Sequence, residues 1–176
     1  MDRVLRSAIL NSNVIDVIQD NKRPFDELMS KYRCAIMEIE TKFKVLNEQY
    51  SLQYDRNPIE TIKTRLKSME SISRKLAQKG KSFSAKSMEE NLDDIAGVRV
   101  ICSFQEDIYT LAKCLLDQDD IELLETKDYI KNPKESGYKS YHMLVTVPIF
   151  LSDRVIDTKV EIQIRTMAMD FWATIE

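Results

Sequence analysis

The sequence has 176 residues, of which 43% are hydrophobic and 31% are charged, and its formal net charge is −3. This balance is typical of a single folded domain and argues against a long disordered chain. No apolar run is long enough to cross a bilayer, and the N-terminus lacks the pattern of a signal peptide. The three cysteines have no metal-ligand spacing. We therefore expect a cytoplasmic protein with free thiols and no membrane partner.

A long helix is predicted near the N-terminus, over residues 24–54, with Pro24 in its first turn. Apolar side chains recur there at intervals of three and four residues, which indicates one buried face. The residues of this face are Phe25, Leu28, Tyr32, Ile36, Ile39, Phe43, Leu46 and Tyr50. Such a stripe favours a core or a subunit contact over a ligand site. The residues before Asn21 are expected to form another short helix.

A further helix is predicted to begin at Asn57, as its N-cap, with Pro58 as its first residue. It should end at about Gln78, because Gly80 is a typical C-terminal stop. The buried side of this helix would consist of Ile62, Leu66, Met69, Ile72 and Leu76. A short helical turn over residues 84–91 should follow.

The same predicted helix carries several polar side chains whose role the pattern leaves open. Lys67, Ser71 and Lys75 are spaced at i, i+4 and i+8, so they would form either a solvated face or a phosphate-binding one. Arg65 would turn toward the apolar side, where a guanidinium needs a carboxylate, a phosphate or a flat ring as partner. Arg99, inside the apolar segment IAGVRVICSF, raises the same question.

The second half of the chain alternates between strand-like and helix-like patterns. The segment over residues 95–104 is β-branched and apolar, so we predict a central strand. The predicted elements that follow are a helix over residues 105–116, strands over 121–130, 138–148 and 155–165, and a final helix over 167–176. The last two strands should form a hairpin. This order predicts an α+β fold, a mixed sheet flanked by helices.

Two groups of acidic side chains are associated with these strands. Asp93 and Asp94 precede the central strand, where a carboxylate can hold Mg²⁺ but can equally cap a helix or add solubility. In VEIQIR, Glu161, Gln163 and Arg165 alternate with apolar residues. This alternation fits an edge strand with a solvated outer face, or a carboxylate and an amide held side by side on a rigid element.

Residues 127–142, KDYIKNPKESGYKSYH, combine four lysines, three tyrosines and the single histidine of the chain. The segment is either a solvated basic hairpin or a surface for an anionic, flat ligand. In the second case Tyr138 could stack on a base, and Lys127, Lys134 and Lys139 could bind phosphates. Charge is segregated elsewhere too, since residues 56–86 are basic and residues 87–125 are acidic. Charge alone favours solvated faces.

Four segments in this order resemble the RelA/SpoT-type (p)ppGpp synthetase domain, and in particular the small alarmone synthetases of bacteria. The segments are RLKSMESISRKL, DIAGVRVICSF, KDYIKNPKESGYKSYH and VEIQIRTMAMDFWATIE. The resemblance covers residues 24–176 and implies a mixed sheet of the nucleotidyltransferase type. It divides the chain into an N-terminal helical region, 1–54, and a synthetase catalytic domain, 55–176, that together form one globular unit.

The resemblance implies a GTP diphosphokinase of the stringent response. Such an enzyme transfers the β,γ-pyrophosphate of ATP to the 3′-hydroxyl of GDP or GTP, giving AMP and ppGpp or pppGpp. Asp94 and Glu161 would hold the cofactor Mg²⁺, and Glu161 would also accept the proton of the hydroxyl. ATP and GDP or GTP are therefore the expected substrates, and no nucleic acid is expected as a partner.

The resemblance also distributes further residues between two nucleotide sites. The ATP site would consist of Arg65 and Arg99 around the adenine and of Lys67, Ser71 and Lys75 at the phosphates. Tyr138 would stack on guanine. The remaining residues of the acceptor site would be Lys127, Tyr129, Lys134, Ser136, His142 and Gln163. Ser136 stands where larger relatives often have Asn.

Small members of this group usually continue past the segment WATIE with helices that help to form a homotetramer. We therefore expect an oligomer, and a sequence that is part of a longer chain. One histidine and this length predict no hydrolase domain. Two other functions stay open: a pyrophosphotransferase whose acceptor is an adenosine nucleotide or the 3′ end of tRNA, and an inactive nucleotide-sensing module. Intact Asp94 and Glu161 argue against the inactive module.

Overall fold

The computed structural model describes the backbone of residues 2–175 and the side chains of residues 22–175. Its elements are α1 (Asp2–Tyr54), β1 (Ile59–Leu66), α2 (Met69–Gln78), α3 (Ala85–Asn91), β2 (Ala96–Cys102), α4 (Gln105–Leu116), β3 (Glu122–Asp128), β4 (Tyr141–Phe150), β5 (Val155–Thr166) and α5 (Met167–Ile175). The predicted α+β fold, a mixed sheet with flanking helices, is confirmed. Within this part of the chain no helix is long and apolar enough to cross a membrane.

The five strands form one sheet in the order β1-β2-β5-β4-β3. β2 and β5 are parallel, and the other neighbouring pairs are antiparallel. The predicted hairpin of β4 and β5 is confirmed, although β4 begins at Tyr141 rather than at Tyr138. The segment VEIQIR lies in β5, between β2 and β4, so the edge-strand interpretation is wrong. The strand that carries Glu161 is the middle strand of the sheet.

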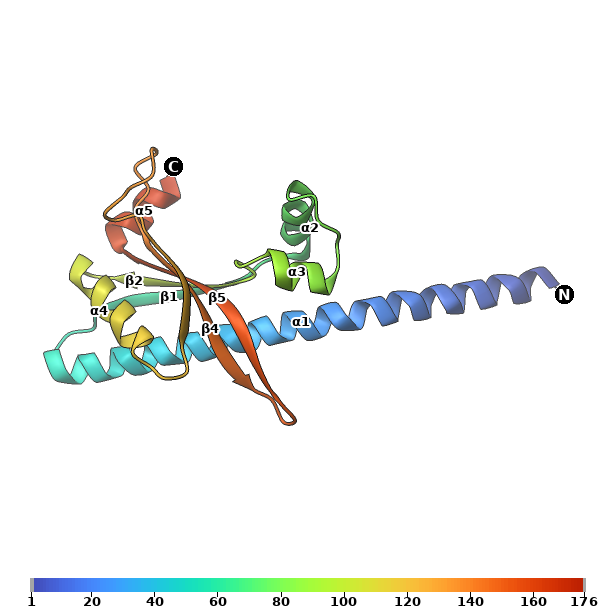
Figure 1. The fold of residues 1–176 in the computed structure, drawn as a ribbon, viewed down its shortest axis with the longest axis horizontal. Helices are drawn as coiled ribbons and strands as arrows, with labels where there is room; N and C mark the ends of the chain where they lie inside the picture. The colour runs from blue at the N-terminus through green and yellow to red at the C-terminus, as the bar shows by residue number, and fades with distance from the viewer. Residues whose placement is uncertain (1, 176) are drawn as a thin grey trace.

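One face of the sheet forms the hydrophobic core. α1 contacts β1, β2, β4 and β5 on this face, and α4 contacts β2, β5 and α1 (Figure 1). Fully buried side chains from these helices and strands include Ile39, Phe43, Leu111, Val100, Ile162 and Ile164. Their removal from water, at about 25 cal/mol per Å² of apolar surface, drives the packing. The opposite face remains available for polar side chains.

α1 differs from the predicted first helix at its N-terminal end. The helix ends at Tyr54 as expected, but it begins at Asp2, so Pro24 lies inside it and not in its first turn. A proline inside a helix removes one backbone hydrogen bond and crowds the preceding turn. No glycine and no other proline occurs before Pro58. One proline is therefore insufficient to divide this segment into two helices.

The prediction of a helix that begins at Asn57 is also wrong over its first half. Residues 59–66 form β1, which pairs antiparallel with β2. The segment IETIKTRL is rich in β-branched residues, which favour a strand when a partner strand is available. Arg65 consequently lies exposed on a strand and not on the apolar side of a helix. Lys67 follows β1 and does not share a helical stripe with Ser71 and Lys75.

The capping residues of the next helices explain where they begin and end. Ser68 is the N-cap of α2, and its hydroxyl oxygen accepts from the backbone N–H of Ser71 at 3.2 Å. The helix ends at Gln78, as predicted, and Gly80 follows with a φ of +65°. Ser84 caps α3 in the same way. α2 and α3 are thus fixed next to the end of β1 and the start of β2.

Candidate active site

Side chains from all five strands form two adjacent rows on the sheet face opposite α1 and α4. Strand register gives the first row as Lys63, Arg99, Gln163, His142 and Lys127. It gives the second row as Arg65, Gly97, Glu161, Leu144 and Glu125. The two rows are two residues apart along every strand, and alternate residues of a strand project to the same face, so the rows share one surface. Many of the predicted site residues fall on this surface.

Asp94 lies two residues before the start of β2 and is held by two lysines. Its Oδ2 atom is 2.7 Å from Nζ of Lys67 and 2.7 Å from Nζ of Lys75. Burial alone would raise the pKa of Asp94, but the two ammonium groups outweigh it and the pKa lies below its ordinary value. Asp94 Oδ1 is buried and has no hydrogen-bond partner within residues 22–175. One oxygen of this carboxylate therefore remains available to a ligand.

Glu161 is oriented by its neighbour on the same face of β5. Gln163 Nε2 donates to Glu161 Oε1 at 2.7 Å, while Gln163 Oε1 accepts from Arg99 Nε at 3.3 Å and from Arg165 at 2.5 Å. Only one orientation of the amide satisfies these contacts, because the guanidinium groups need its oxygen and the carboxylate needs its NH₂. The predicted pairing of a carboxylate and an amide is present.

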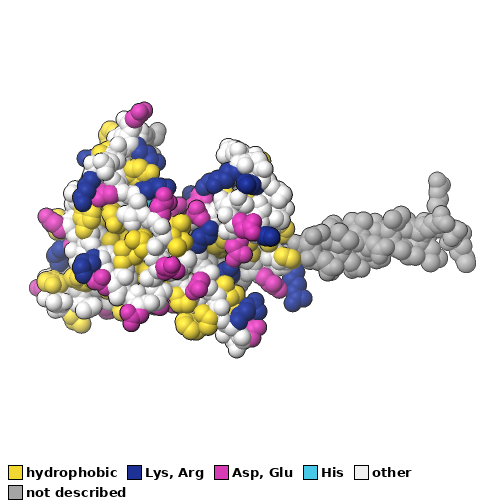
Figure 2. Space-filling model, viewed as in Figure 1, with side chains coloured by type: hydrophobic (Ala, Val, Ile, Leu, Met, Phe, Trp, Pro, Cys, Tyr) yellow, Lys and Arg dark blue, Asp and Glu magenta, His cyan; other side chains and the backbone are white. Residues whose placement is uncertain are grey.

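Two cavities adjoin these carboxylates, and Asp94 and Glu161 line both of them. The first has a volume of about 130 Å³, and its lining includes Arg65, Gly97, Arg99 and Gln163. The second has a volume of about 290 Å³, and its lining includes Lys75, Lys127, Tyr129, Lys134 and His142. Figure 2 shows the molecule hollowed between the lobe of α2 and α3 and the lobe of α5, with basic and acidic side chains along the hollow.

The first cavity has open space because of Gly97. In the second row, Gly97 lies between Arg65 and Glu161. A Cβ atom at this position would be 3.6 Å from the carbonyl oxygen of Arg65, an ordinary contact, so the backbone does not require glycine. The missing side chain instead leaves room between a guanidinium and a carboxylate. A flat group could enter there.

The second cavity is bordered by an aromatic cluster from the loop before β4 and from β4 itself. The rings of Tyr129, Tyr138 and His142 contact one another edge to face, with centroids 5.1 to 6.0 Å apart. Lys134 Nζ lies 4.8 Å from the ring centre of Tyr129 and 4.9 Å from that of Tyr138. Gly137, with a φ of +85°, gives the loop its turn next to Tyr138. The cluster is therefore an aromatic surface occupied by a cation.

The protonation of His142 follows from its neighbours. Arg165 donates to the hydroxyl oxygen of Tyr138 at 2.7 Å, so the Tyr138 hydroxyl can donate its own proton to His142 Nε2, which is 2.9 Å away. In this arrangement the ring proton is on Nδ1, which faces Glu161 Oε1 at 3.9 Å. Burial lowers the pKa of His142 from 6.5 to about 4, and nearby Arg165 and other cations add to this effect. The imidazole is neutral at pH 7.

The low pKa of His142 makes the stability of the free protein depend on pH. Between pH 6.5 and about 4 the unfolded chain binds a proton that the folded chain does not bind. The free energy of unfolding should therefore fall as the pH falls through this window, by up to about 3 kcal/mol. Urea unfolding without nucleotide or Mg²⁺, on both sides of the window, measures this loss. His142→Gln should reduce the slope, and an unchanged slope would contradict the assignment.

Three predicted residues are less directly placed. The Ser71 hydroxyl accepts from the Ser68 hydroxyl at 3.0 Å at the start of α2. Ser136 and Lys139 lie exposed on the loop before β4. As far as residues 22–175 define the two cavities, neither lining includes these three side chains, nor those of Lys67 and Tyr138. Lys67 contacts the site only through its ion pair with Asp94, as far as the described residues show.

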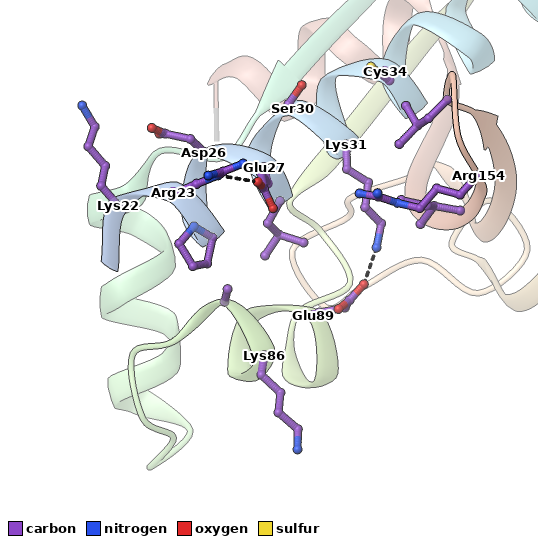
Figure 3. Close-up of a pocket in the computed structure, with 15 residues that line it drawn as sticks. Lys22, Arg23, Asp26, Glu27, Ser30, Lys31, Cys34, Lys86, Glu89 and Arg154 are labelled. Atoms are coloured by element: carbon purple, nitrogen blue, oxygen red, sulfur yellow. Dashed lines mark hydrogen bonds and ion pairs between the residues drawn. The ribbon is translucent and has the colours of Figure 1, made fainter. Parts of the chain in front are cut away.

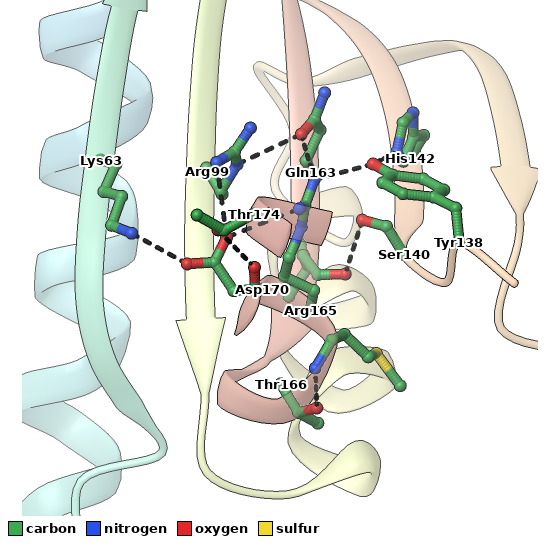
Figure 4. Close-up of polar contacts among 12 residues, drawn as sticks. Lys63, Arg99, Tyr138, Ser140, His142, Gln163, Arg165, Thr166, Asp170 and Thr174 are labelled. Atoms are coloured by element: carbon green, nitrogen blue, oxygen red, sulfur yellow. Dashed lines mark hydrogen bonds and ion pairs between the residues drawn. The ribbon is translucent and has the colours of Figure 1, made fainter. Parts of the chain in front are cut away.

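Several residues of the site were not predicted, among them Lys63 and Glu125 of the two rows, and Arg165 and Asp170 beside them. Arg165 contacts Tyr138 and Gln163, and Asp170 contacts Arg99 and Lys63 (Figure 4). The alternation in VEIQIR could have indicated Arg165, since it extends the series of Glu161 and Gln163 on the same face. Asp170 had no comparable signal in the sequence, because its contacts connect α5 with β1 and β2.

The largest cavity lies elsewhere. It has a volume of about 770 Å³ and is bordered by α1, α3 and the hairpin of β4 and β5 (Figure 3). Four of its charged side chains pair with one another, Arg23 with Glu27 and Lys31 with Glu89. Neither Asp94 nor Glu161 lines this cavity. The cavities next to these carboxylates are therefore the better candidates for chemistry.

A carboxylate pair shared by two cation-rich cavities suits an enzyme that transfers a charged group between two bound substrates. The sequence agrees with this class. The family described as "Region found in RelA / SpoT proteins" matches residues 64–176. The protein belongs to this family, and the resemblance that the four sequence motifs indicated is confirmed.

Individual relatives are similar over most of the chain. GTP pyrophosphokinase YwaC of Bacillus subtilis is 47% identical over 145 residues, which are 82% of this chain and 69% of the relative. A crystal structure of small alarmone synthetase 2 from Bacillus subtilis has a TM-score of 0.77 at 42% identity, and covers 86% of this chain and 77% of that chain. Small alarmone synthetase 1 from the same organism, bound to its product pppGpp, has a TM-score of 0.78 at 37% identity, and covers 87% of this chain and 78% of that chain.

Proposed function

We propose that this protein is a GTP pyrophosphokinase that transfers the β,γ-pyrophosphate of ATP to the 3′-hydroxyl of GDP or GTP. The products would be AMP and ppGpp or pppGpp. The observation that carries the proposal is that Asp94 and Glu161 line both cavities. A group bound in one cavity can therefore be transferred, next to these two carboxylates, to a substrate bound in the other cavity. The name of YwaC and the product held by small alarmone synthetase 1 support this chemistry.

In the proposed step, the 3′-oxygen of the acceptor forms a bond to the β-phosphorus of ATP. The bond between the β-phosphorus and the oxygen bridging to the α-phosphorus breaks, and AMP leaves with its electron pair. Glu161 would accept the proton of the hydroxyl, since it is partly exposed and is oriented by Gln163. Placing both substrates at this carboxylate would supply much of the acceleration.

Mg²⁺ is proposed as the cofactor, held by Asp94 and Glu161. The buried Oδ1 atom of Asp94 fits this role, because it has no protein partner among the described residues. Among those residues no cluster of three or more His, Cys, Asp or Glu side chains could hold a metal ion. Mg²⁺ commonly takes one or two protein carboxylates, with phosphates and water as its other ligands. When bound, it would neutralise charge on the phosphates.

The two cavities would divide the substrates between them. The adenine of ATP would lie between Arg65 and Arg99, because a guanidinium stacks well on a flat ring. Lys67 and Lys75, with Ser71 at the start of α2, would bind the ATP phosphates. The acceptor guanine would stack on Tyr138, which requires Lys134 to leave the ring that it now contacts. Lys134 and Lys127 would then contact the acceptor phosphates.

A labelling assay tests the proposed function. The protein is incubated with Mg²⁺, GDP and ATP labelled on its γ-phosphate. We expect the label on a guanosine product and one AMP released for each product formed, with no transfer when Mg²⁺ is chelated. Parallel reactions with an adenosine nucleotide or tRNA as acceptor identify the acceptor class. Label on these acceptors and not on GDP would overturn the assignment of guanosine nucleotides.

The proposal also includes a homotetramer in the cytoplasm. An exposed apolar stripe on α5 supports subunit contact, because Met167, Phe171 and Ile175 are 53%, 68% and 61% exposed and recur every four residues. The cysteines are free thiols, which fits a reducing compartment. Light scattering of the purified protein after size-exclusion chromatography would measure the subunit number.

A further inference from the structure

Arg165 is a buried cation next to the first row, two residues along β5 from Gln163. Its side chain is 2% exposed, and one guanidinium nitrogen donates both to Tyr138 and to Gln163. The guanidinium carbon lies 5.2 Å from the ring centre of Tyr138. Its Nε atom has no hydrogen-bond partner among the atoms described for residues 22–175. A buried charge of this kind is costly unless an opposite charge is close.

The opposite charge comes from Asp170 on α5. Asp170 Oδ1 lies 3.5 Å from Arg165 and accepts from Arg99 at 3.4 Å, while Oδ2 accepts from Lys63 at 2.8 Å. Figure 4 shows Asp170 between Lys63 on β1 and Arg99 on β2, with Arg165 leading to Tyr138. Burial alone would raise the pKa of Asp170, but Lys63 and the two arginines lower it below its ordinary value. The carboxylate is charged and forms ion pairs with three cations.

These contacts connect the two cavities through one side chain. Arg99 lines the first cavity, where the donor adenine is proposed to bind. Arg165 fixes the hydroxyl of Tyr138, on which the acceptor base is proposed to stack. Gln163 accepts from both arginines, so a displacement of either one also affects the amide that orients Glu161. Asp170 is 13% exposed and lines neither cavity, as far as the described residues define them.

We propose that Asp170 is a positioning residue that orients Arg99 at the donor site and, through Arg165, Tyr138 at the acceptor site. It does this without touching either nucleotide, so α5 sets the geometry of both sites. The inference rests on the proposed function for the identity of the two nucleotides.

A purely structural role for Asp170 predicts a different result. Asp170 lies in the first turn of α5, where a negative charge stabilises the helix dipole, and Thr166 caps the same turn at 3.3 Å. Loss of that effect would lower the melting temperature but would leave the two nucleotide affinities unchanged. Affinity for each nucleotide is therefore the measurement that separates the two roles.

The test is Asp170→Asn, which keeps the shape of the side chain and removes its charge. Calorimetry with Mg²⁺ and GDP, and separately with Mg²⁺ and a non-hydrolysable ATP analogue, gives the two Kd values. Both should rise about threefold to tenfold, the range of one lost hydrogen bond. In a Tyr138→Phe background, the substitution should still weaken the ATP analogue but should weaken GDP by less than about twofold.

Asp117→Asn is the matched control. Asp117 pairs with Lys113 at 2.5 Å on the exposed surface at the end of α4, so both Kd values should stay unchanged. Asp170→Ser carries the same expectation as Asp170→Asn and replaces it if that variant does not fold. Unchanged Kd values in a folded Asp170 variant would overturn the inference. The inference would also be overturned if Asp170→Asn weakened GDP binding as much in the Tyr138→Phe background as in the wild-type protein. Wild-type protein that bound neither nucleotide would instead overturn the proposed function.

Discussion

Replacing Glu161 by glutamine should slow pyrophosphate transfer by about 10³-fold or more, while GDP still binds. The substitution removes the proposed base and one proposed Mg²⁺ ligand in a single step. It leaves the shape of the side chain intact, and an amide oxygen can still accept from Gln163 Nε2, so the fold of the site should survive. AMP release under saturating ATP and GDP measures the rate, and calorimetry with GDP measures the retained affinity.

Glu122→Gln provides the matched control for this prediction. Glu122 lies exposed at the start of β3, where it accepts from Thr146 at 3.4 Å, and it belongs to neither row of the site. The control should retain the wild-type rate. A Glu161→Gln protein with more than about a tenth of the wild-type rate would remove Glu161 from both proposed roles, because a general base alone contributes about 10²–10⁴-fold.

The sequence predicted best those elements whose pattern is local. α4 has the predicted bounds, and β2, α3 and α5 lie close to theirs, because capping residues and apolar spacing define them within one segment. β1 was assigned to a helix because Asn57 and Pro58 form a strong helix-start signal and Ile62 and Leu66 are four residues apart. The strand depends on pairing with β2, a contact between distant residues that no local pattern contains.

The site shows the same division between local and distant contacts. Glu161 and Gln163 could be predicted together, because alternation along one strand places them on one face. That Asp94 and Glu161 line the same cavities depends on β2 pairing with β5, and this neighbour relation is a property of the sheet. The contacts of Asp170 depend on the packing of α5 against β5 and β2, which no local pattern contains. The residues that touch the cavities were thus easier to predict than the residues that orient them.

Replacing Tyr138 by alanine should weaken GDP binding about tenfold to a hundredfold and should change binding of an ATP analogue by less than about twofold. Stacking of one base on an aromatic ring contributes about 1–3 kcal/mol, which gives this range. The effect should be confined to the acceptor, because Tyr138 contacts Tyr129, Lys134 and His142 and lies on the loop before β4. Calorimetry with each nucleotide in the presence of Mg²⁺ gives both affinities.

Tyr138→Phe separates the ring from its hydroxyl. It keeps the stacking surface and removes the acceptor of the Arg165 hydrogen bond, so GDP binding should weaken only about threefold to tenfold. Tyr54→Ala, which removes an exposed tyrosine at the end of α1, is the control and should leave both affinities unchanged. An equal loss of both nucleotides in Tyr138→Ala would mean that the loop supports the whole site. A loss confined to GDP would identify this loop as the guanosine-binding element.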